Sequence, residues 1–372
     1  MIKFNVPYLT GREEKYFQQC LQQKSLIGDG FFTKKVCGFL EKKCNYKKVL
    51  LTPSCTAALE MAALVLGLKK GDEVIVPSYT FVSTANAFIL QGIKPVFVDI
   101  KLETVNMDES KVEKLITKKT KAIVVVHYGG VSCHMQEILK IAKRHNLYVI
   151  EDAAQGICAK YKEKYLGSIG DIGCISFHGT KNIVCGEGGA LVLNKKKYIK
   201  RAEIIREKGT NRSKFLREEV DKYTWIDRGS SYLLSEINAS FLYAQIKEMA
   251  NITRQRLKIW DQYYNKLINY SEKVHILKPP QDCYHNAHLF FLIFKSTILR
   301  DNFIRHMKNE KIHCTTHYEP LHLSPYSKKN KFKNGELKTT SFVHNGLVRL
   351  PIYPGVNFKR VIDASERFLK LI

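Results

Sequence analysis

The sequence predicts an α/β fold in which helices sandwich a mostly parallel central sheet, followed by a smaller α+β region. Between residues 49 and 193, short apolar runs rich in β-branched residues alternate with segments of helical character. Strands that are apolar along their whole length, without alternation, are typical of a parallel sheet buried on both faces. After Pro279 and Pro280 the pattern changes, which indicates a separate, smaller region.

The elements are expected in the following order. Thr10 and Glu13 form a capping-box pattern, which predicts a first helix over residues 10–24. Helices are also expected over 56–66 and 80–91, and a long helix from about 235 to 267. We place a domain boundary within that long helix, giving a large domain 1–250 and a small domain 251–372. The expected strands are 49–51, 73–76, 95–98, 122–126, 148–150, 172–177, 189–193 and 289–294.

Composition excludes several classes of protein. The chain has 372 residues, 45% of them hydrophobic, and no run resembling a membrane span or a signal peptide. Its ten cysteines form no C-x-x-C pair, which fits buried thiols in a reducing cytoplasm rather than disulfides or a zinc site. The net charge of +25 comes from lysines spread over the whole length. We therefore expect a lysine-rich surface that attracts anionic small molecules, with no nucleic-acid or membrane partner.

Two residues predict pyridoxal phosphate (PLP) chemistry. Lys181 lies in the polar turn that follows the strand ending near Phe177, and a glycine-rich stretch, 186–189, comes next. Asp152 ends the apolar run 147–150. A lysine amine can form a Schiff base with the PLP aldehyde, and a carboxylate can keep the pyridinium nitrogen protonated. Both side chains are expected at the carboxyl edge of the sheet, where open α/β sheets bind ligands.

A second group of residues points to the same edge. The segment 53–57 joins a strand to a helix whose free amides could hold a phosphate, although Ser54 or Thr56 could equally be an ordinary helix cap. Phe81, at the next strand-to-helix junction, could stack on a planar ring or belong to the core. His178, three residues before Lys181, could be an ordinary turn residue, but its position beside that lysine favours a polar role in the site.

The C-terminal histidines 313, 317 and 322 surround Tyr318 on a loop that contains Pro320. Three histidines could hold a metal ion, but no carboxylate or cysteine ligand accompanies them at a suitable spacing. We expect no metal site here. A polar loop that faces the substrate is the better interpretation.

These motifs resemble the DegT-type sugar aminotransferases. The similarity extends from residues 4–11 to 349–351, and idiosyncratic matches lie at 77–87, 205–213, 220–225 and 229–233. The resemblance implies a PLP-dependent aminotransferase of fold type I. It also implies a homodimer, since this family builds its sites at a dimer interface.

The resemblance also implies roles for individual residues. Lys181 would be the Schiff-base lysine and proton shuttle, Asp152 the partner of the pyridinium nitrogen, and Gln155 a neighbour of the phenolic oxygen. The cofactor would further contact Phe81, Thr56, Ala57, Ser176 and His178. Leu233 stands where many members carry an asparagine that reaches the neighbouring subunit's phosphate site, so Ser230 or Ser231 would replace it. The implied substrate-binding residues are Gly28, Tyr318 and His322.

The implied reaction transfers an amino group from L-glutamate, which leaves as 2-oxoglutarate, to a nucleotide-linked 4-keto-6-deoxyhexose. Within the family, the resemblance favours conversion of dTDP-4-keto-6-deoxyglucose into dTDP-4-amino-4,6-dideoxygalactose, a precursor of surface polysaccharides. UDP- or GDP-sugars and the opposite configuration at C4 remain open. A PLP-dependent dehydratase on the same scaffold would carry histidine in place of Lys181. A non-catalytic binding protein would not need Lys181, Asp152 and Gln155 together.

Overall fold

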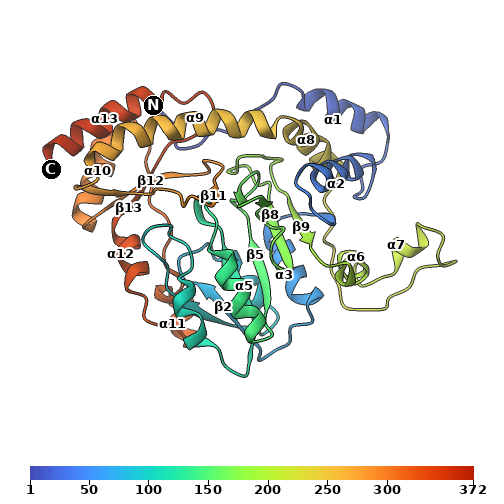
Figure 1. Cartoon of the computed structure of the whole chain (residues 1–372). Helices are drawn as coiled ribbons and strands as arrows, with labels where there is room; N and C mark the ends of the chain where they lie inside the picture. The colour runs from blue at the N-terminus through green and yellow to red at the C-terminus, as the bar shows by residue number, and fades with distance from the viewer.

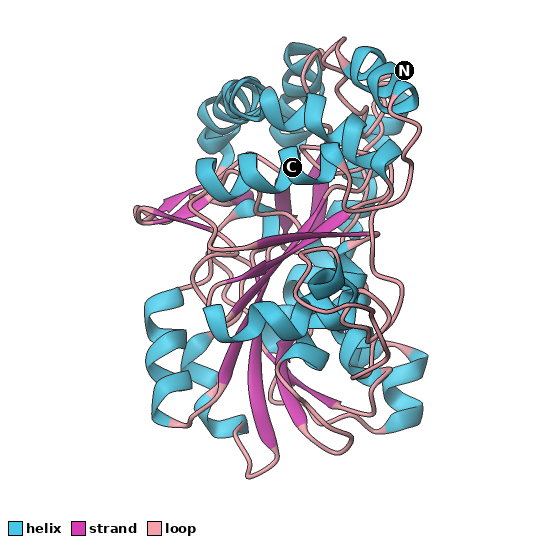
Figure 2. Ribbon diagram, turned by 90° about the vertical axis from the view of Figure 1, so that its right-hand side faces the viewer, coloured by secondary structure: helices cyan, strands magenta, loops and turns pink.

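The computed structural model describes residues 1–372 and contains thirteen α-helices and thirteen β-strands (Figures 1 and 2). The helices are α1 Glu13–Gln22, α2 Phe31–Lys43, α3 Cys55–Val65, α4 Ser83–Ile89, α5 Met135–Arg144, α6 Ile199–Arg206, α7 Arg212–Phe215, α8 Glu236–Lys247, α9 Met249–Leu267, α10 Thr297–Asn309, α11 Pro325–Asn330, α12 Lys338–Gly346 and α13 Phe358–Leu371. The strands are β1 Val49–Thr52, β2 Glu73–Pro77, β3 Lys94–Val98, β4 Thr120–Val126, β5 Tyr148–Asp152, β6 Lys160–Tyr161, β7 Lys164–Tyr165, β8 Ile172–Ser176, β9 Gly189–Leu193, β10 Val274–Ile276, β11 Cys283–Tyr284, β12 Phe290–Phe294 and β13 Leu347–Leu350.

Seven strands form the central sheet, in the order β1-β9-β8-β5-β4-β2-β3. Neighbouring strands from β3 to β8 run parallel, and only β9 runs antiparallel to both of its neighbours. The α/β fold with a mostly parallel sheet is therefore confirmed. Because nearly all strands share one direction, their carboxyl ends meet at one edge, where open sheets of this kind bind ligands.

Both faces of the sheet are covered by helices (Figure 2). Alternate residues of one strand enter different cores: Ile75 packs in one apolar cluster, while Val74 and Val76 pack in another. The first cluster includes side chains of α2, α5 and α8, and the second includes those of α3, α4 and α6. Burial on both faces explains why these strands are apolar at every position.

A second, antiparallel sheet of order β10-β12-β13 lies in the C-terminal third of the chain. Its apolar cluster takes residues from α9, α10 and α13, including Trp260, Phe303 and Phe368. Helix α9 runs along the top of the molecule in Figure 1, from α8 to the region of α13. A small sheet of order β11-β6-β7 joins the two regions through the pairing of Cys283 with Tyr161.

Three expected helices differ from those observed. The helix expected over 235–267 is two helices, because α8 ends at Lys247 and α9 begins at Met249. Helix α8 buries its residues in the first cluster of the central sheet, whereas most of α9 packs on the second sheet, so the chain must change direction between them.

The other two helices are shorter than expected. Helix α1 begins at Glu13 rather than at residue 10, because Gly11 has a positive φ of 79° that a right-handed helix does not allow. Glu13 still accepts a hydrogen bond from the Thr10 N–H at 2.8 Å, so half of the capping box is present. Helix α4 begins at Ser83, and the preceding residues 80–82 form a loop.

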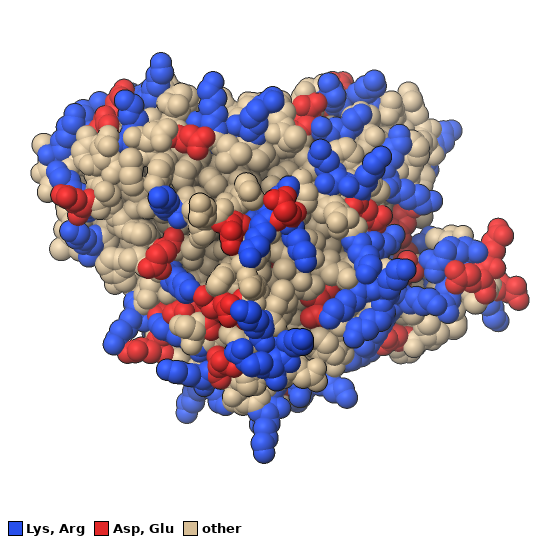
Figure 3. Space-filling model, viewed as in Figure 1, with Lys and Arg blue, Asp and Glu red and all other residues tan.

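The surface is basic without a single dominant patch in the view of Figure 3. Lysine and arginine side chains spread over most of this face, with acidic side chains between them. All ten cysteines are free. None of the helices combines the length and apolar character that a membrane crossing requires.

Gly173 offers a test of how tightly the central sheet packs. A Cβ at this position of β8 would overlap the backbone of Gly167, which leaves no flexible side chain to move aside. We expect Gly173→Ala to destabilise the protein by about 1–3 kcal/mol, seen as a lower thermal unfolding midpoint. Gly38→Ala is the control, because a Cβ there meets nothing within 4 Å on the exposed face of α2 and should stabilise slightly. Equal midpoints for the two variants would contradict this packing.

Candidate active site

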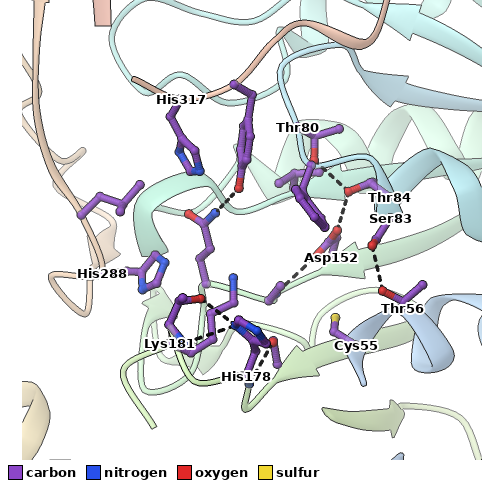
Figure 4. A pocket seen from close by; sticks show the side chains of 18 of the residues that line it. Cys55, Thr56, Thr80, Ser83, Thr84, Asp152, His178, Lys181, His288 and His317 are labelled. Atoms are coloured by element: carbon purple, nitrogen blue, oxygen red, sulfur yellow. Dashed lines mark hydrogen bonds between the residues drawn. The ribbon is translucent and has the colours of Figure 1, made fainter. Parts of the chain in front are cut away.

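A cavity of about 720 Å³ lies at the carboxyl edge of the central sheet. Its walls come from the segments that follow β1, β2, β5 and β8, and from residues of the C-terminal third, including Arg256, His288, Tyr318 and Arg349. The cavity is thus formed where the two sheets and their connecting loops approach each other. Lys181 and Asp152 both line it, as the sequence predicts (Figure 4).

Asp152 is held in place by hydrogen bonds at the end of β5. Its Oδ2 accepts a hydrogen bond from Thr84 Oγ1 at 2.7 Å, and Thr80 Oγ1 lies 2.8 Å from Thr84 Oγ1. Its Oδ1 accepts from the Ala154 N–H at 3.1 Å. Burial raises the pKa of Asp152, while the hydrogen bonds from Thr84 and Ala154 and the charge of Lys181 lower it. These hydrogen bonds therefore fix the orientation of the carboxylate and partly offset the effect of burial on its ionised form.

Lys181 lies in the turn between β8 and β9. The turn is closed by backbone hydrogen bonds from the Lys181 N–H to His178 O at 2.9 Å and from the Gly179 N–H to Gly186 O at 2.8 Å. Burial lowers the pKa of Lys181, which nearby Cys55 and Asp152 partly offset. Lys181 belongs to none of the ion pairs in the structure, and its lowered pKa makes the neutral, nucleophilic amine easier to form than in an exposed lysine.

The segment before α3 forms a small polar turn at the opposite wall. Ser54 caps the helix by accepting the Ala57 N–H at 3.0 Å, and Thr56 Oγ1 donates to Ser83 Oγ at 2.8 Å. Gly189 of β9 packs so closely on the backbone of Ser54 and Cys55 that a side chain there would overlap it. The helix start and its hydroxyls provide a site that suits a phosphate.

The aromatic wall is held by Gln155 and two tyrosines. Gln155 accepts the Gly129 N–H at 2.6 Å and donates to the Tyr318 hydroxyl at 3.0 Å, so its amide is fixed at both ends. His317 Nδ1 lies 3.0 Å from the Tyr128 hydroxyl, and its ring contacts that of Tyr318. Phe81 is more than half exposed, and its ring lies 6.2 Å from that of Tyr318.

The structure places most predicted site residues on the cavity wall. These are Thr56, Phe81, Asp152, Gln155, Ser176, His178, Lys181 and Tyr318. His178 Nδ1 lies 2.8 Å from Thr180 Oγ1, and its Nε2 lies 3.4 Å from Glu187. The histidine thus helps to shape the turn that carries Lys181.

Four predicted residues do not line the cavity of this chain. The Ala57 N–H is already bound by Ser54, and His322 Nδ1 lies 2.7 Å from Ser78 Oγ, outside the cavity. Gly28 packs against the backbone of Leu234 and the side chain of Leu233. A Cβ at this position would overlap both, which explains why the residue is glycine. Ser231 is exposed and pairs with Glu207 in an isolated bridge.

Several residues of the cavity wall were not foreseen from the sequence. Thr84 follows Thr80 by four residues, a spacing that could have signalled a shared helical face. Arg256, Arg349 and His288 come from distant segments. Residues 349–351 carry part of the family resemblance, but that match did not place Arg349 in the site, and nothing in the local sequence marks the other two. Burial keeps the pKa of His288 well below its usual value, and its Nδ1 lies 2.9 Å from Asn182 Oδ1.

The C-terminal histidines serve different contacts. His317 lies by Tyr128 and His322 by Ser78, while the ring of His313 contacts Phe4. No three His, Cys, Asp or Glu side chains are grouped so that they could hold a metal ion.

Comparison with known proteins places the chain in a family. The model of the DegT/DnrJ/EryC1/StrS aminotransferase family matches residues 7–367. The chain belongs to this family. It is a PLP-dependent sugar aminotransferase, and its scaffold is that of fold type I.

Individual relatives cover nearly the full length of this aminotransferase. An uncharacterised protein of Methanocaldococcus jannaschii is 38% identical over 352 residues, 91% of this chain and 90% of the relative. GDP-perosamine synthase of Escherichia coli O157:H7 is 34% identical over 361 residues, 97% of this chain and 95% of the relative. The structure of the sugar aminotransferase Spr1654 from Streptococcus pneumoniae, in its PMP form, aligns with a TM-score of 0.92 over 100% of both chains at 24% identity.

The residues of this aminotransferase fit PLP. Lys181 presents an amine without an acidic partner to the cavity, Asp152 presents a buried carboxylate, and the turn at Ser54 and Thr56 presents hydroxyls at a helix start. Each Asp152 oxygen accepts a single hydrogen bond within the chain, so the carboxylate can still accept one from the protonated nitrogen of a pyridine ring.

Thr84 provides a test of how Asp152 is kept ionised. Its hydrogen bond lowers the pKa of Asp152, so Thr84→Val should raise that pKa. A carboxyl with a higher pKa becomes protonated at a higher pH, so the acid limb of the pH profile of kcat/KM should move upward. Thr84→Ser keeps the hydroxyl and should leave the limb where it is in the wild type. An acid limb that is the same in both variants would contradict the assigned role of Thr84.

Proposed function

We propose that this enzyme transfers the amino group of L-glutamate to the 4-keto carbon of a nucleotide-linked 4-keto-6-deoxyhexose, giving a 4-amino-4,6-dideoxyhexose nucleotide for surface polysaccharide synthesis in the cytoplasm. The observation that carries the proposal is the pairing of Lys181 and Asp152 in one cavity at the carboxyl edge of the sheet. The family membership of the whole chain supports a sugar as the acceptor.

Different walls of the cavity would contact different parts of PLP. Asp152 would hold the ring nitrogen, Phe81 one ring face, Gln155 the side of the phenolic oxygen, and Thr56 and Ser176 the phosphate. When bound, PLP supplies the aldehyde that carries the amino group and the ring that draws electrons from the reacting carbon. Hydrogen bonds from Thr84 and Gly129 fix Asp152 and Gln155 before any ligand binds, which lowers the cost of orientation.

Lys181 would move the proton in both halves of the reaction. In the first half its Nζ would take a proton from the Cα of L-glutamate and deliver it to the cofactor's C4′. In the second half it would take a proton from C4′ and deliver it to C4 of the sugar. An amine needs a lowered pKa to accept a proton near neutral pH, and burial lowers the pKa of Lys181. L-Glutamate leaves as 2-oxoglutarate before the sugar binds, so the scheme is ping-pong.

Three nucleotides are candidates for the sugar carrier, namely dTDP, GDP and UDP. The idiosyncratic sequence matches favour dTDP-4-keto-6-deoxyglucose, whereas the relative from Escherichia coli O157:H7 is named for a GDP-linked sugar. That relative is 34% identical over 97% of this chain, which supports GDP as a carrier.

The reaction is tested with purified enzyme, L-glutamate and the 4-keto-6-deoxyhexose linked to GDP, dTDP or UDP. We expect an amino sugar from one of the three, identified with its C4 configuration by NMR. Lys181→Ala should lower the rate by at least about 100-fold, because the proton carrier is lost, and should also remove the visible absorbance of the lysine-bound cofactor. A wild-type enzyme that aminates none of the three sugars, or a Lys181→Ala variant with unchanged rate, would overturn the proposal.

We also propose that the enzyme is a homodimer. An arm that contains α7 projects from the body of the molecule in Figure 1, and it carries exposed apolar side chains, among them Phe215, Trp225 and Ile226. An exposed apolar surface of this kind is typical of a protein interface. In a dimer, such an arm could bring Ser230 or Ser231 to the phosphate site of the neighbouring copy.

Light scattering coupled to size exclusion should give about twice the chain mass of 42.8 kDa. Trp225→Asp should shift this mass toward the monomer, because a charge in an apolar interface is costly. Trp260→Phe, a conservative change inside the second sheet's core, should leave the mass unchanged. A wild-type enzyme that is active and strictly monomeric would refute the dimer.

A further inference from the structure

His288 is a buried histidine of the cavity wall whose position is fixed by the chain around it. It lies between β11 and β12, where its backbone N–H donates to Asn286 Oδ1 at 3.0 Å. Its carbonyl accepts a hydrogen bond from Arg256 Nη2 at 2.9 Å. The ring lines the same cavity as Lys181 (Figure 4). Neither the contacts to PLP nor the proton transfer by Lys181 involves this ring.

The hydrogen bonds of Asn182 determine which ring nitrogen of His288 carries a proton. Asn182 Nδ2 donates to Asn286 O at 2.9 Å, so the amide oxygen of Asn182 faces the histidine. That oxygen can only accept a hydrogen bond, and it lies 2.9 Å from His288 Nδ1. His288 Nδ1 is therefore the protonated nitrogen, and it donates to Asn182. In a neutral ring, Nε2 then carries a lone pair and acts as an acceptor.

The ring of His288 is neutral, and its Nε2 is open to the cavity. Burial, followed by the charges of Lys181 and Arg256, keeps the pKa of His288 well below its usual value. Nε2 forms no hydrogen bond within the chain, and unlike His275 Nε2 it is not enclosed by protein atoms. The small accessible part of this residue belongs to the cavity wall, so the lone pair of Nε2 faces the space that a ligand occupies.

We propose that His288 Nε2 accepts a hydrogen bond from the 3-hydroxyl of the keto sugar, which makes His288 a specificity-determining residue for the sugar. The inference rests on the proposed function, because it concerns the sugar's half of the same reaction. It deepens that function by naming the hydroxyl that the enzyme recognises beside the reacting carbon.

A lone pair at this position discriminates among the groups that the two substrates offer. Carboxylates and a diphosphate carry no proton to donate near neutral pH, so an acceptor disfavours both of them. L-Glutamate has no hydroxyl, and its amino group is the group that is transferred. A hydroxyl of the sugar is therefore the donor that suits His288 Nε2.

The position of His288 near Lys181 favours the hydroxyl at C3. The charge of Lys181 contributes to the lowered pKa of His288, so the two side chains lie close to each other. Lys181 must reach C4 of the sugar to deliver a proton. The carbons next to C4 are C3, which carries a hydroxyl, and C5, which carries a methyl group in a 6-deoxyhexose. The 3-hydroxyl is thus the one hydroxyl on a carbon adjacent to C4.

The test combines variants of His288 with a keto sugar that lacks the 3-hydroxyl. His288→Phe removes the acceptor and keeps a planar ring, while His288→Gln keeps one donor for Asn182 and one acceptor for the sugar. His145→Gln is the matched control, because His145 is exposed after α5 and its ring contacts only Glu113. Each holoenzyme is first converted to its pyridoxamine form with L-glutamate and then mixed with the keto sugar that the wild type uses, or with its 3-deoxy analogue. Absorbance follows the two half-reactions separately.

We expect His288→Phe to lower kcat/KM for the keto sugar by about 10- to 100-fold, because the 3-hydroxyl then enters the cavity without an acceptor. The wild type should lose a similar factor on the 3-deoxy analogue, whereas His288→Phe should use the two sugars within about threefold of each other. His288→Gln should fall between His288→Phe and the wild type. The glutamate half-reaction should stay within about twofold of the wild type in every variant, and His145→Gln should match the wild type throughout.

Two results would overturn the proposal. One is a His288→Phe variant that still prefers the sugar with the 3-hydroxyl as strongly as the wild type does. The other is an equal loss in both half-reactions, which would assign His288 to the support of Asn182 and the lysine turn. Failure of the proposed function is a separate result, in which the wild type aminates no 4-keto-6-deoxyhexose.

Discussion

The geometry of the site depends on two consecutive carboxylates at the end of β5, those of Glu151 and Asp152. Neighbouring residues of a strand point to opposite faces, so Glu151 and Asp152 serve different sides of the sheet. Glu151 is fully buried and accepts the N–H groups of Gly167, Ile169 and Gly170, at 2.8, 2.6 and 2.6 Å. Its Oε2 also lies 3.0 Å from His127 Nε2. A charge so deeply buried is tolerated only with such complete hydrogen bonding.

The bonds of Glu151 fix the segment that precedes β8, and through it the lysine turn. His127 Nδ1 accepts the Cys133 N–H at 3.2 Å, so the ring's proton lies on Nε2 and is donated to Glu151. Gly170 passes against the carbonyl of Val149, and only glycine leaves room for it there. Strand β8 therefore begins at a set register beside β5 and ends at Ser176, which delivers Lys181 to the cavity that contains Asp152.

The fold and the centre of the site could be predicted from the sequence because their signals are local. Apolar runs without alternation predict buried parallel strands, and strand ends place Asp152 and Lys181 at one edge. Arg256 and Arg349 could not be predicted, because they reach the cavity only through the packing of α9 and β13 on the first region. The break at Glu248 was missed for a similar reason: no proline or glycine marks it, and the change of packing partner sets it.

For Gly28 and His322, local packing already accounts for the residue, and the substrate contact that the family resemblance implies stays a prediction. His322 lies within hydrogen-bond distance of Ser78, and Gly28 leaves room for the backbone of Leu234.

The chemistry of the cavity wall depends on the charges of Asp152 and Lys181. Burial raises the pKa of Asp152 and lowers that of Lys181, so it disfavours both charges at once.

The ionised forms of Asp152 and Lys181 must therefore be stabilised partly by the charges of bound ligands. A cationic ring nitrogen beside Asp152 would favour the carboxylate form of that residue. A ligand charge of opposite sign beside a buried group would then offset part of the free-energy penalty of burying that group's charge. Such compensation would favour substrates whose charged groups lie beside the fixed charges of the cavity. It would also let one cavity accept an amino acid and a nucleotide sugar in turn.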